Sequence, residues 1–245
     1  MKILAVIPSR YDSTRLRGKP LAMIGNRSMV QRVYEATKKC PHFSKVVVAT
    51  DSELVADCVA KFGGEVQITS VDHKSGTDRV AEVAQLYPEM DVVVNVQGDQ
   101  PFVTVQMLTD LVNPYLQGEL PVMTTLACPL KLAVDYRNPN TVKVLCDRHN
   151  NALYFSRAPI PYFRNPGNAP VYHHLGLYGF TRDFLAQYTK LSPSPLEKCE
   201  ALEQLRVLEN GFKIRVCLTT ETVMEVNTPD DLIQANRLIS EKYIF

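Results

Sequence analysis

The chain has 245 residues, a length that suits one α/β domain or two small ones and is ample for a hydrophobic core. Its 27 basic and 26 acidic residues give a formal net charge of +1, which disfavours nucleic acid as a partner because polyanion binders usually carry a basic excess. Hydrophobic residues make up 45% of the chain but form no run of the roughly twenty that a membrane span needs. The first ten residues also lack the features of a secretory signal, so we expect a cytoplasmic protein without a membrane partner.

The first third of the chain alternates between short apolar runs and amphipathic segments. The runs are rich in β-branched residues and apolar on both faces, as buried parallel strands are, and the segments between them have helical periodicity. In chain order we predict a strand at 2–8, a helix at 28–39, a strand at 45–50, a helix at 53–62, a strand at 65–69, a helix at 77–87 and a strand at 91–96. This rhythm predicts a Rossmann-like α/β fold, a mostly parallel sheet with helices on both faces.

The middle of the chain changes to strand patterns with little helix between them. Strands are predicted at 121–130, 141–147, 152–157 and 174–181, with a proline-rich loop at 158–170. The pattern then predicts helices at 182–188 and about 196–209, a strand at 213–218 and a closing helix from Asp230. We therefore predict a single domain over 1–245, in which about 121–181 is a β-rich insertion.

The cysteines show no pattern of a metal site or a disulfide framework. None of the six forms a CxxC pair, and no His-x3–5-His motif accompanies them. We expect reduced, mostly buried thiols at Cys40, Cys58, Cys128, Cys146, Cys199 and Cys217.

A basic loop directly follows the first predicted strand. Its four cations are Arg10, Arg15, Arg17 and Lys19, and its small or hydroxyl residues are Ser13, Thr14 and Gly18. Ligands of open α/β sheets bind at the carboxyl ends of strands, and Arg, Lys and backbone NH groups together suit a polyphosphate. The alternative is a solvated surface loop. Because neither GxxxxGK[ST] nor GxGxxG is present, we expect neither a P-loop nor an NAD-dependent oxidoreductase.

Two further segments carry polar groups near strand or helix ends. Asp99, beside Gly98 at the end of the strand at 91–96, is an accessible carboxylate of the kind that holds Mg²⁺ next to a triphosphate. Its alternative role is to cap the helix that follows Pro101. Ser75 and Thr77 could be helix-cap residues. Arg79 would face the N-terminus of that helix, where the exposed NH groups favour an anion or a base.

The ordered motifs of this chain resemble those of the 3-deoxy-manno-octulosonate (KDO) cytidylyltransferases, also called CMP-KDO synthetases. The resemblance covers residue 2 to about residue 240 and rests on Ser9-Arg10, Ser13-Thr14-Arg15-Leu16, Gly18-Lys19-Pro20-Leu21, Ala49-Thr50-Asp51, Ser75-Gly76-Thr77-Asp78-Arg79, Asn95-Val96-Gln97-Gly98-Asp99, Leu153-Tyr154-Phe155-Ser156-Arg157, His174-Leu175-Gly176 and Leu202-Glu203-Gln204-Leu205-Arg206. It implies a fold of the nucleotide-diphospho-sugar transferase type. It also implies transfer of CMP from CTP to KDO with release of pyrophosphate, for lipopolysaccharide or another surface polysaccharide.

The resemblance also implies roles for individual residues. The catalytic residues would be Lys19, Arg10 and Asp99. The CTP-binding residues would be Arg10, Ser13, Arg15, Lys19, Ser75, Arg79 and Gln97. The sugar-binding residues would be Gln97, Arg157, His174, Tyr178, Glu203 and Gln204. Mg²⁺ would be the cofactor, held by Asp99 and Asn227, and the chain would form a homodimer in which the insertion at 121–181 binds the sugar and makes the dimer contact.

Plainer readings of two sugar-side residues remain open. His174 could be a core histidine with a satisfied hydrogen bond, and Glu203 could pair with Arg206 on one helix face.

The chain departs from the family pattern at three positions. Arg17 stands where Pro is usual, Gln100 where Glu is usual, and Asn227 where Asp is usual. An Asn oxygen can still ligate Mg²⁺ but brings no charge, so we expect a weakened metal site. These departures leave open a cytidylyltransferase for another acidic sugar, such as 8-amino-KDO or a sialic acid, and a nucleotide-binding module without catalysis.

Overall fold

The computed structural model describes residues 1–13, 15–131, 135–165 and 169–242. The chain forms two compact units, one of Met1–Leu108 with Val223–Phe245 and one of Thr109–Thr222. We call the first the nucleotide unit, because it contains the predicted CTP-binding residues. We call the second the insertion unit, because it contains the predicted insertion at about 121–181. The single domain over 1–245 stays a prediction.

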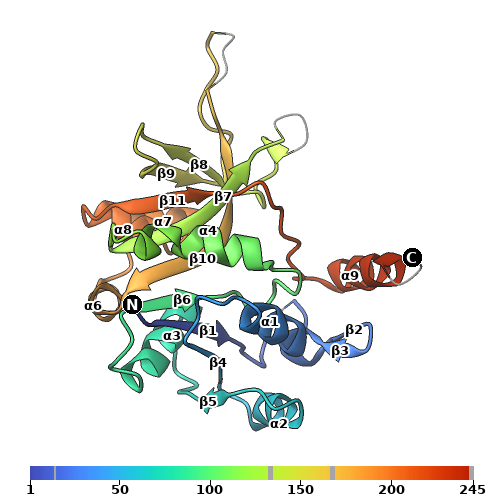
Figure 1. The fold of residues 1–245 in the computed structure, drawn as a ribbon. Coiled ribbons are helices and arrows are strands. Elements are labelled where there is room, and N and C mark those ends of the chain that lie inside the picture. The colour runs from blue at the N-terminus through green and yellow to red at the C-terminus, as the bar shows by residue number, and fades with distance from the viewer. Residues whose placement is uncertain (14, 132–134, 166–168, 243–245) are drawn as a thin grey trace. The chain divides into compact units, whose positions relative to one another are not determined.

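The nucleotide unit is built on four parallel strands (Figure 1). They are β1 (Ile3–Pro8), β4 (Lys45–Thr50), β5 (Val66–Ile68) and β6 (Val92–Asn95), in the order β5-β4-β1-β6. Ala5 pairs with Val46 on one side of β1 and with Val94 on the other. Every residue of β1 from Ile3 to Ile7 has no exposed surface, which explains why the run is apolar on both faces.

The connections place helices on both faces of these strands. Helices α1 (Met29–Lys38) and α2 (Glu53–Lys61) lead from β1 to β4 to β5, and α3 (Gly76–Gln85) returns the chain to β6 on the other side of β1. Because such crossovers are right-handed, the reversal of direction puts α3 on the opposite face from α1 and α2. The predicted parallel α/β arrangement is confirmed, and its switch point lies between β1 and β6.

The sequence explains where these helices begin and end. Ser28 caps α1, its hydroxyl accepting from the Gln31 NH at 3.4 Å. Ser75 and Asp78 form a reciprocal capping box at the start of α3, as the cap reading of Ser75 predicts. Gly63 has a φ of +75°, a conformation that favours glycine, and it ends α2.

The C-terminal segment packs beside the segment that follows the basic loop. The 3-10 helix η1 (Lys19–Leu21) leads into the hairpin of β2 (Met23–Ile24) and β3 (Arg27–Ser28), and the chain closes with α9 (Pro229–Lys242). Ile24, Met29, Val226 and Ala235 form one fully buried cluster. This packing holds the segment before α9 next to the loop after β1, although the two are some two hundred residues apart in sequence.

Helix α4 (Val105–Leu116) contains the boundary between the two units. The Thr104 hydroxyl accepts from the Met107 NH at 3.2 Å, so Thr104 is the capping residue. The alternative role of Asp99 as the cap of this helix is therefore wrong.

The insertion unit is rich in strands, as predicted. It contains β7 (Met123–Pro129), β8 (Lys143–Cys146), β9 (Ala152–Ser156), β10 (Tyr172–Thr181) and β11 (Ile214–Leu218). β7 pairs with β10 antiparallel and with β11 parallel, while β8 pairs antiparallel with both β10 and β9.

The prediction of one helix over about 196–209 is wrong. The structure has α6 (Arg182–Tyr188) as predicted, followed by two short helices, α7 (Pro195–Glu200) and α8 (Leu205–Glu209). The chain turns at Ala201, whose φ is +50°. The turn lets Arg206 reach back to α7, where its Nε donates to Glu197 Oε2 at 2.8 Å. The alternative pairing of Glu203 with Arg206 stays a prediction.

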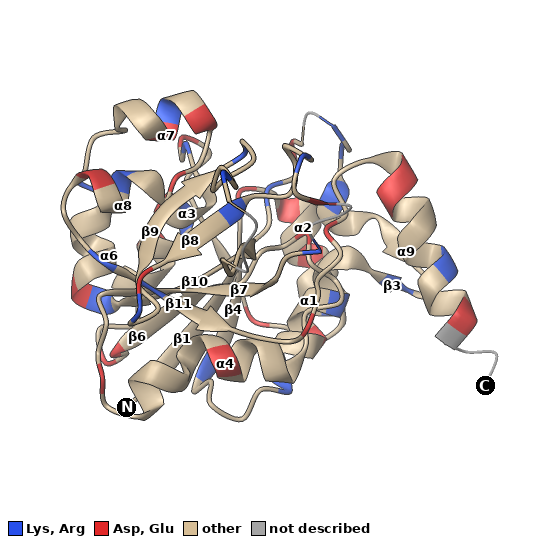
Figure 2. Cartoon of the chain, turned by 90° about the horizontal axis from the view of Figure 1, so that it is seen from above, with Lys and Arg blue, Asp and Glu red and all other residues tan. Residues whose placement is uncertain are grey.

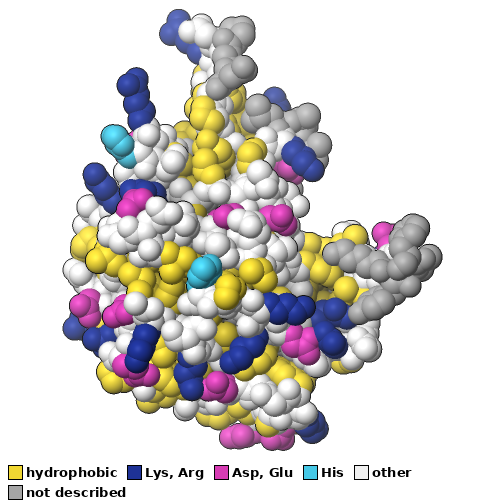
Figure 3. Space-filling view, viewed as in Figure 1, with side chains coloured by type: hydrophobic (Ala, Val, Ile, Leu, Met, Phe, Trp, Pro, Cys, Tyr) yellow, Lys and Arg dark blue, Asp and Glu magenta, His cyan; other side chains and the backbone are white. Residues whose placement is uncertain are grey.

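Charges of both signs are mixed over the surface. Figure 2 shows basic and acidic residues interspersed along α7, α8 and α9. On the face in Figure 3, Lys and Arg alternate with Asp, Glu and hydrophobic side chains. All six cysteines are free thiols, of which Cys40, Cys128 and Cys217 are buried. None of the described helices combines the length and apolar character that crossing a membrane requires.

Candidate active site

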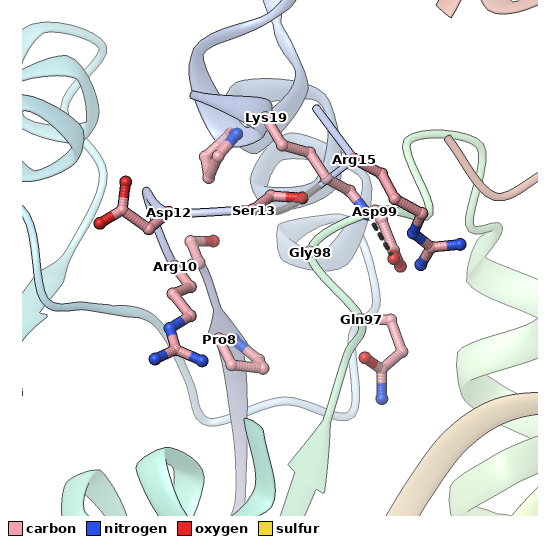
Figure 4. A pocket seen from close by; sticks show the side chains of 11 residues that line it. Pro8, Arg10, Asp12, Ser13, Arg15, Lys19, Gln97, Gly98 and Asp99 are labelled. Carbon is pink, nitrogen blue, oxygen red and sulfur yellow. Dashed lines mark hydrogen bonds and ion pairs between the residues drawn. The ribbon is translucent and has the colours of Figure 1, made fainter. Parts of the chain in front are cut away.

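A pocket of about 310 Å³ opens at the carboxyl ends of β1 and β6 (Figure 4). This volume lies in the range of small-molecule sites, about 300 to 1,000 Å³. The lining residues are Pro8, Ser9, Arg10, Asp12, Ser13, Arg15, Lys19, Pro20, Gln97, Gly98 and Asp99. They come from the two loops that flank the switch point of the sheet, which is where ligands of open α/β sheets bind.

Two glycines shape this pocket. A Cβ atom at Gly98 would lie 2.6 Å from the Pro8 carbonyl oxygen, so the close approach of the two loops requires glycine there. Gly18 has a φ of +66°, and its NH donates to the Tyr11 carbonyl at 3.1 Å. This contact folds the basic loop back on itself before η1 begins at Lys19.

The folded loop brings the predicted phosphate ligands together. Arg10, Ser13, Arg15 and Lys19 all line the pocket, while Arg17 is not among the lining residues. Thr14 lies outside the described residues.

Lys19 joins the two predicted metal ligands. Its Nζ atom lies 2.7 Å from Asp99 Oδ2 and 2.9 Å from Asn227 Oδ1. Arg15 Nη2 donates to the same Asn227 oxygen at 3.0 Å. A carboxylate oxygen and an amide oxygen therefore converge on one cationic group, and both are the hard donors that Mg²⁺ prefers. The described residues contain no group of three or more His, Cys, Asp or Glu that could hold a metal, so a cation here would take its other ligands from substrate and water.

Glu225 is a neighbour of this pair that the sequence did not indicate. Its Oε2 atom accepts from Asn227 Nδ2 at 3.0 Å, and Gln100 Nε2 lies 3.5 Å from its Oε1 atom. The residue has substantial exposed surface, but its carboxyl group lies among protein atoms. This desolvation, and next the Asp99 carboxylate, raise the pKa of Glu225.

A smaller pocket of about 130 Å³ adjoins the first and shares Pro8, Arg10 and Gln97 with it. Its other lining residues are His73, Lys74, Ser75, Gly76 and Arg79, at the N-terminus of α3. All seven predicted CTP-binding residues thus line one or both pockets.

Asp51 anchors the basic loop to the smaller pocket, a role that the sequence analysis missed. Its Oδ2 atom lies 2.7 Å from Arg79 Nη2 and 3.8 Å from Arg10 Nε, and its Oδ1 atom accepts from the Tyr11 NH at 3.4 Å. The signal was present, because Asp51 directly follows β4, the strand beside β1.

The predicted sugar-side residues other than Gln97 lie in the insertion unit, and three of them form one cluster. Tyr178 OH donates to Gln204 Oε1 at 3.1 Å, and the rings of His174 and Tyr178 are 5.5 Å apart. Glu203 Oε2 accepts from Tyr188 OH at 3.3 Å.

Arg157 is held by a different set of contacts. Its Nε donates to the Glu200 carbonyl at 2.7 Å, and its NH donates to the Glu200 carboxylate at 2.9 Å.

His174 is neutral and hydrogen-bonded. Burial, and next the neighbouring His173, lower its pKa to about 3. The Thr125 hydroxyl donates to the Leu177 carbonyl at 2.8 Å, so its contact of 2.9 Å with His174 Nε2 must be one in which the imidazole donates. The alternative reading of His174 as a satisfied core histidine agrees with these contacts.

Comparison with known proteins decides the family. The family model described as Cytidylyltransferase matches residues 4–214. A 3-deoxy-manno-octulosonate cytidylyltransferase of Acaryochloris marina is 62% identical over 241 residues, which is 98% of each chain. The chain belongs to this family. Another cytidylyltransferase of that name, from Fusobacterium nucleatum, is 44% identical over 244 residues, covering 100% of this chain and 99% of its own.

Solved structures agree with the family and the fold. A CMP:2-keto-3-deoxy-manno-octonic acid synthetase complexed with CTP matches with a TM-score of 0.94 and 38% identity, covering 99% of this chain and 100% of its own. A cytidylyltransferase from Leptospira borgpetersenii, 18% identical with a TM-score of 0.66, covers 98% of this chain and 87% of its own and is similar in fold alone. The predicted resemblance and α/β fold are confirmed.

Proposed function

We propose that this chain transfers CMP from CTP to KDO, giving CMP-KDO and pyrophosphate, the reaction for which its relatives are named. The observation that carries this proposal is the basic pocket at the switch point, in a chain 62% identical to such an enzyme over 98% of its length. We propose that the product serves lipopolysaccharide or other surface polysaccharide synthesis and that the reaction takes place in the cytoplasm. A nucleotide-binding module without catalysis is disfavoured, because the relatives that match over nearly the whole chain are named as cytidylyltransferases.

The reaction needs positioning and charge cancellation rather than a nucleophilic side chain. The 2-hydroxyl oxygen of the sugar bonds to the α-phosphorus, the bond from that phosphorus to the pyrophosphate oxygen breaks, and the hydroxyl proton is released. We propose that Arg10, Arg15 and Lys19 bind the triphosphate, with Ser13 as a hydroxyl donor. One charge pair at about 4 Å contributes roughly 4 kcal/mol at an effective dielectric of about 20, before desolvation is counted. Several such pairs, preorganised by the loop, are a sufficient source of rate.

Asp99 and Asn227 fit a divalent cation, and we propose that they hold Mg²⁺. When bound, this ion would neutralise charge on the phosphate oxygens. Lys19 contacts both residues and is a predicted phosphate ligand, so its ammonium links the cation site to the triphosphate site.

The remaining residues are proposed to bind the cytidine part of CTP and the sugar. We propose that Ser75, Arg79 and Gln97 bind the cytidine part of CTP at the N-terminus of α3. Within the insertion unit, the proposed sugar-binding residues are Arg157, His174, Tyr178, Glu203 and Gln204. His174 in its neutral form would act there by shape and hydrogen bonding, since its low pKa removes it as a cation at neutral pH.

Pyrophosphate release tests the proposal. It would be measured with CTP, UTP or ATP, each with KDO, with 8-amino-KDO, with a sialic acid and with no acceptor. We expect release only with an acceptor, with CTP and KDO the preferred pair. If the enzyme preferred 8-amino-KDO or a sialic acid, that sugar and not KDO would be its substrate. Binding of CTP with no release under any combination would support the module without catalysis.

A further inference from the structure

We propose that Glu225 is a positioning residue, which orients the Asn227 side chain so that its oxygen, and not its nitrogen, faces the cation site beside Asp99. This inference rests on the proposed function in one respect, the assignment of Asp99 and Asn227 to the cation.

An asparagine amide has two chemically different ends. Its oxygen only accepts hydrogen bonds and can ligate a cation, while its NH₂ group only donates and repels one. An ionised carboxylate only accepts, so Glu225 Oε2, at 3.0 Å from Asn227 Nδ2, selects the NH₂ end. The amide oxygen is thereby left facing Lys19 Nζ at 2.9 Å and Arg15 Nη2 at 3.0 Å.

Glu225 is the contact that persists when substrate binds. Lys19 and Arg15 are proposed phosphate ligands, so their hydrogen bonds to Asn227 compete with those to the triphosphate. Glu225 is not a proposed phosphate ligand and is not among the residues that line the pocket. Once the cations turn toward phosphate, the Glu225 carboxylate still distinguishes the two ends of the amide.

The surroundings of Glu225 support this role. The NH of the fully buried Val226 donates to the Asp99 carbonyl at 2.9 Å, which fixes the backbone between Glu225 and Asn227 against the loop that carries Asp99. Gln100 Nε2 lies 3.5 Å from the second Glu225 oxygen. Gln100 and Asn227 are both amides, and each directs its NH₂ group toward Glu225. Neither places a like charge beside this carboxylate.

The role of Glu225 should therefore depend on the residue at position 227. An aspartate has two equivalent oxygens and needs no orientation, and Glu225 would repel it. Loss of the Glu225 carboxylate should then weaken cation binding next to Asn227 and strengthen it next to an aspartate.

The test measures Mn²⁺ dissociation constants by electron paramagnetic resonance, in the presence of a CTP analogue with a non-cleavable α,β-methylene bridge. No turnover occurs, so the readout is independent of activity. We expect Glu225→Ala to weaken Mn²⁺ binding about tenfold, the lower end of what loss of such supporting partners costs. Glu225→Gln should stay close to the parent, because its amide oxygen still accepts from Asn227. In the Asn227→Asp background, Glu225→Ala should instead tighten binding.

Two controls distinguish the positioning role from a general charge effect and from a wrongly assigned cation site. Asp230→Asn removes an exposed carboxylate three residues from Asn227 and should leave Mn²⁺ binding unchanged, which excludes a general charge effect. Asp99→Asn should weaken Mn²⁺ binding strongly. If it does not, the assigned cation site is wrong and the proposed function loses its metal. If Asp99→Asn weakens binding but Glu225→Ala has no effect, or weakens it equally in both backgrounds, the positioning role alone is overturned. Glu225→Ser replaces the alanine variant if the latter does not fold.

Discussion

The ion pair between Lys19 and Asp99 joins two groups whose side chains are only 14% and 23% exposed. Partial burial strengthens this interaction relative to a surface pair, and the contact with Asn227 adds a third partner. Lys19 therefore holds the pocket in order before substrate binds and presents its charge where the triphosphate is proposed to lie.

Lys19→Met should lower turnover by about a hundredfold to a thousandfold, the cost of removing one preorganised charge-stabilising donor, and should leave the fold unchanged. The measurement is kcat for pyrophosphate release, with circular dichroism to check the fold. Arg17→Met is the matched control, because it removes a cation from the same loop that does not line the pocket. Near-parental activity of Lys19→Met would contradict the phosphate role of the loop.

His174 should make the protein less stable in acid. Its pKa falls from 6.5 to about 3 on folding, so below pH 6.5 the unfolded chain takes up a proton that the folded chain excludes. The free energy of unfolding is therefore unaffected by this histidine above pH 6.5, and it decreases progressively as the pH falls from 6.5 toward 3. At pH 5 the loss is about 2 kcal/mol.

His174→Gln keeps an NH donor for Thr125 but cannot be protonated. Urea unfolding at pH 7 and pH 5 should show a fall in unfolding free energy smaller by about 2 kcal/mol than in the parent. His149→Gln, at an exposed turn, is the control and should behave as the parent does. An unchanged pH dependence in His174→Gln would show that this imidazole can be protonated in the folded state.

At the scale of elements, the site depends on contacts between the loops that follow the strands of the sheet. Asp51 at the end of β4 contacts the loop after β1 through Tyr11 and contacts α3 through Arg79. The Arg79 side chain is only 3% exposed, so its charge depends on this partner.

Asp51→Asn should therefore loosen the basic loop. We expect the free energy of unfolding to fall by about 2 kcal/mol, the value of a hydrogen bond to a charged group, and the KM for CTP to rise more than kcat falls. Urea unfolding and steady-state kinetics measure the two effects. Asp57→Asn, an exposed carboxylate on α2, should change neither. A kcat effect without a KM effect would contradict the anchoring role.

At the scale of the whole molecule, we predict a two-fold homodimer that uses the region of β8 and β9. Leu153 on β9 is 62% exposed, so its side chain is available for contact with a partner surface in this region. Light scattering at micromolar concentration should give twice the chain mass of 27.6 kDa.

Leu153→Glu should shift the protein toward the monomer. Leu54→Glu, at a residue that is 58% exposed on α2, is the matched control and should leave the mass unchanged. A parental mass of 27.6 kDa would contradict the dimer.

Sequence by itself determined the local structure and the chemistry of the loops. Apolar runs such as 2–8 and 45–50 became buried strands, because burial on both faces of a parallel sheet requires continuous apolar sequence. The capping serines and Gly63 set helix ends through contacts within a few residues. The four cations from Arg10 to Lys19, directly after β1, indicated a polyanion site, because a strand end in such a sheet is where ligands bind.

Only the tertiary structure decided which distant residues meet. The turn at Ala201 brings Arg206 back to Glu197, a pairing that local propensities do not predict. The contacts of Glu225 with Gln100 and Asn227, and of Lys19 with Asn227, exist because the segment before α9 packs beside the basic loop. Hydrophobic periodicity reports which face of an element is buried but not against what. The partners of a buried polar group are therefore decided by packing between segments far apart in the chain.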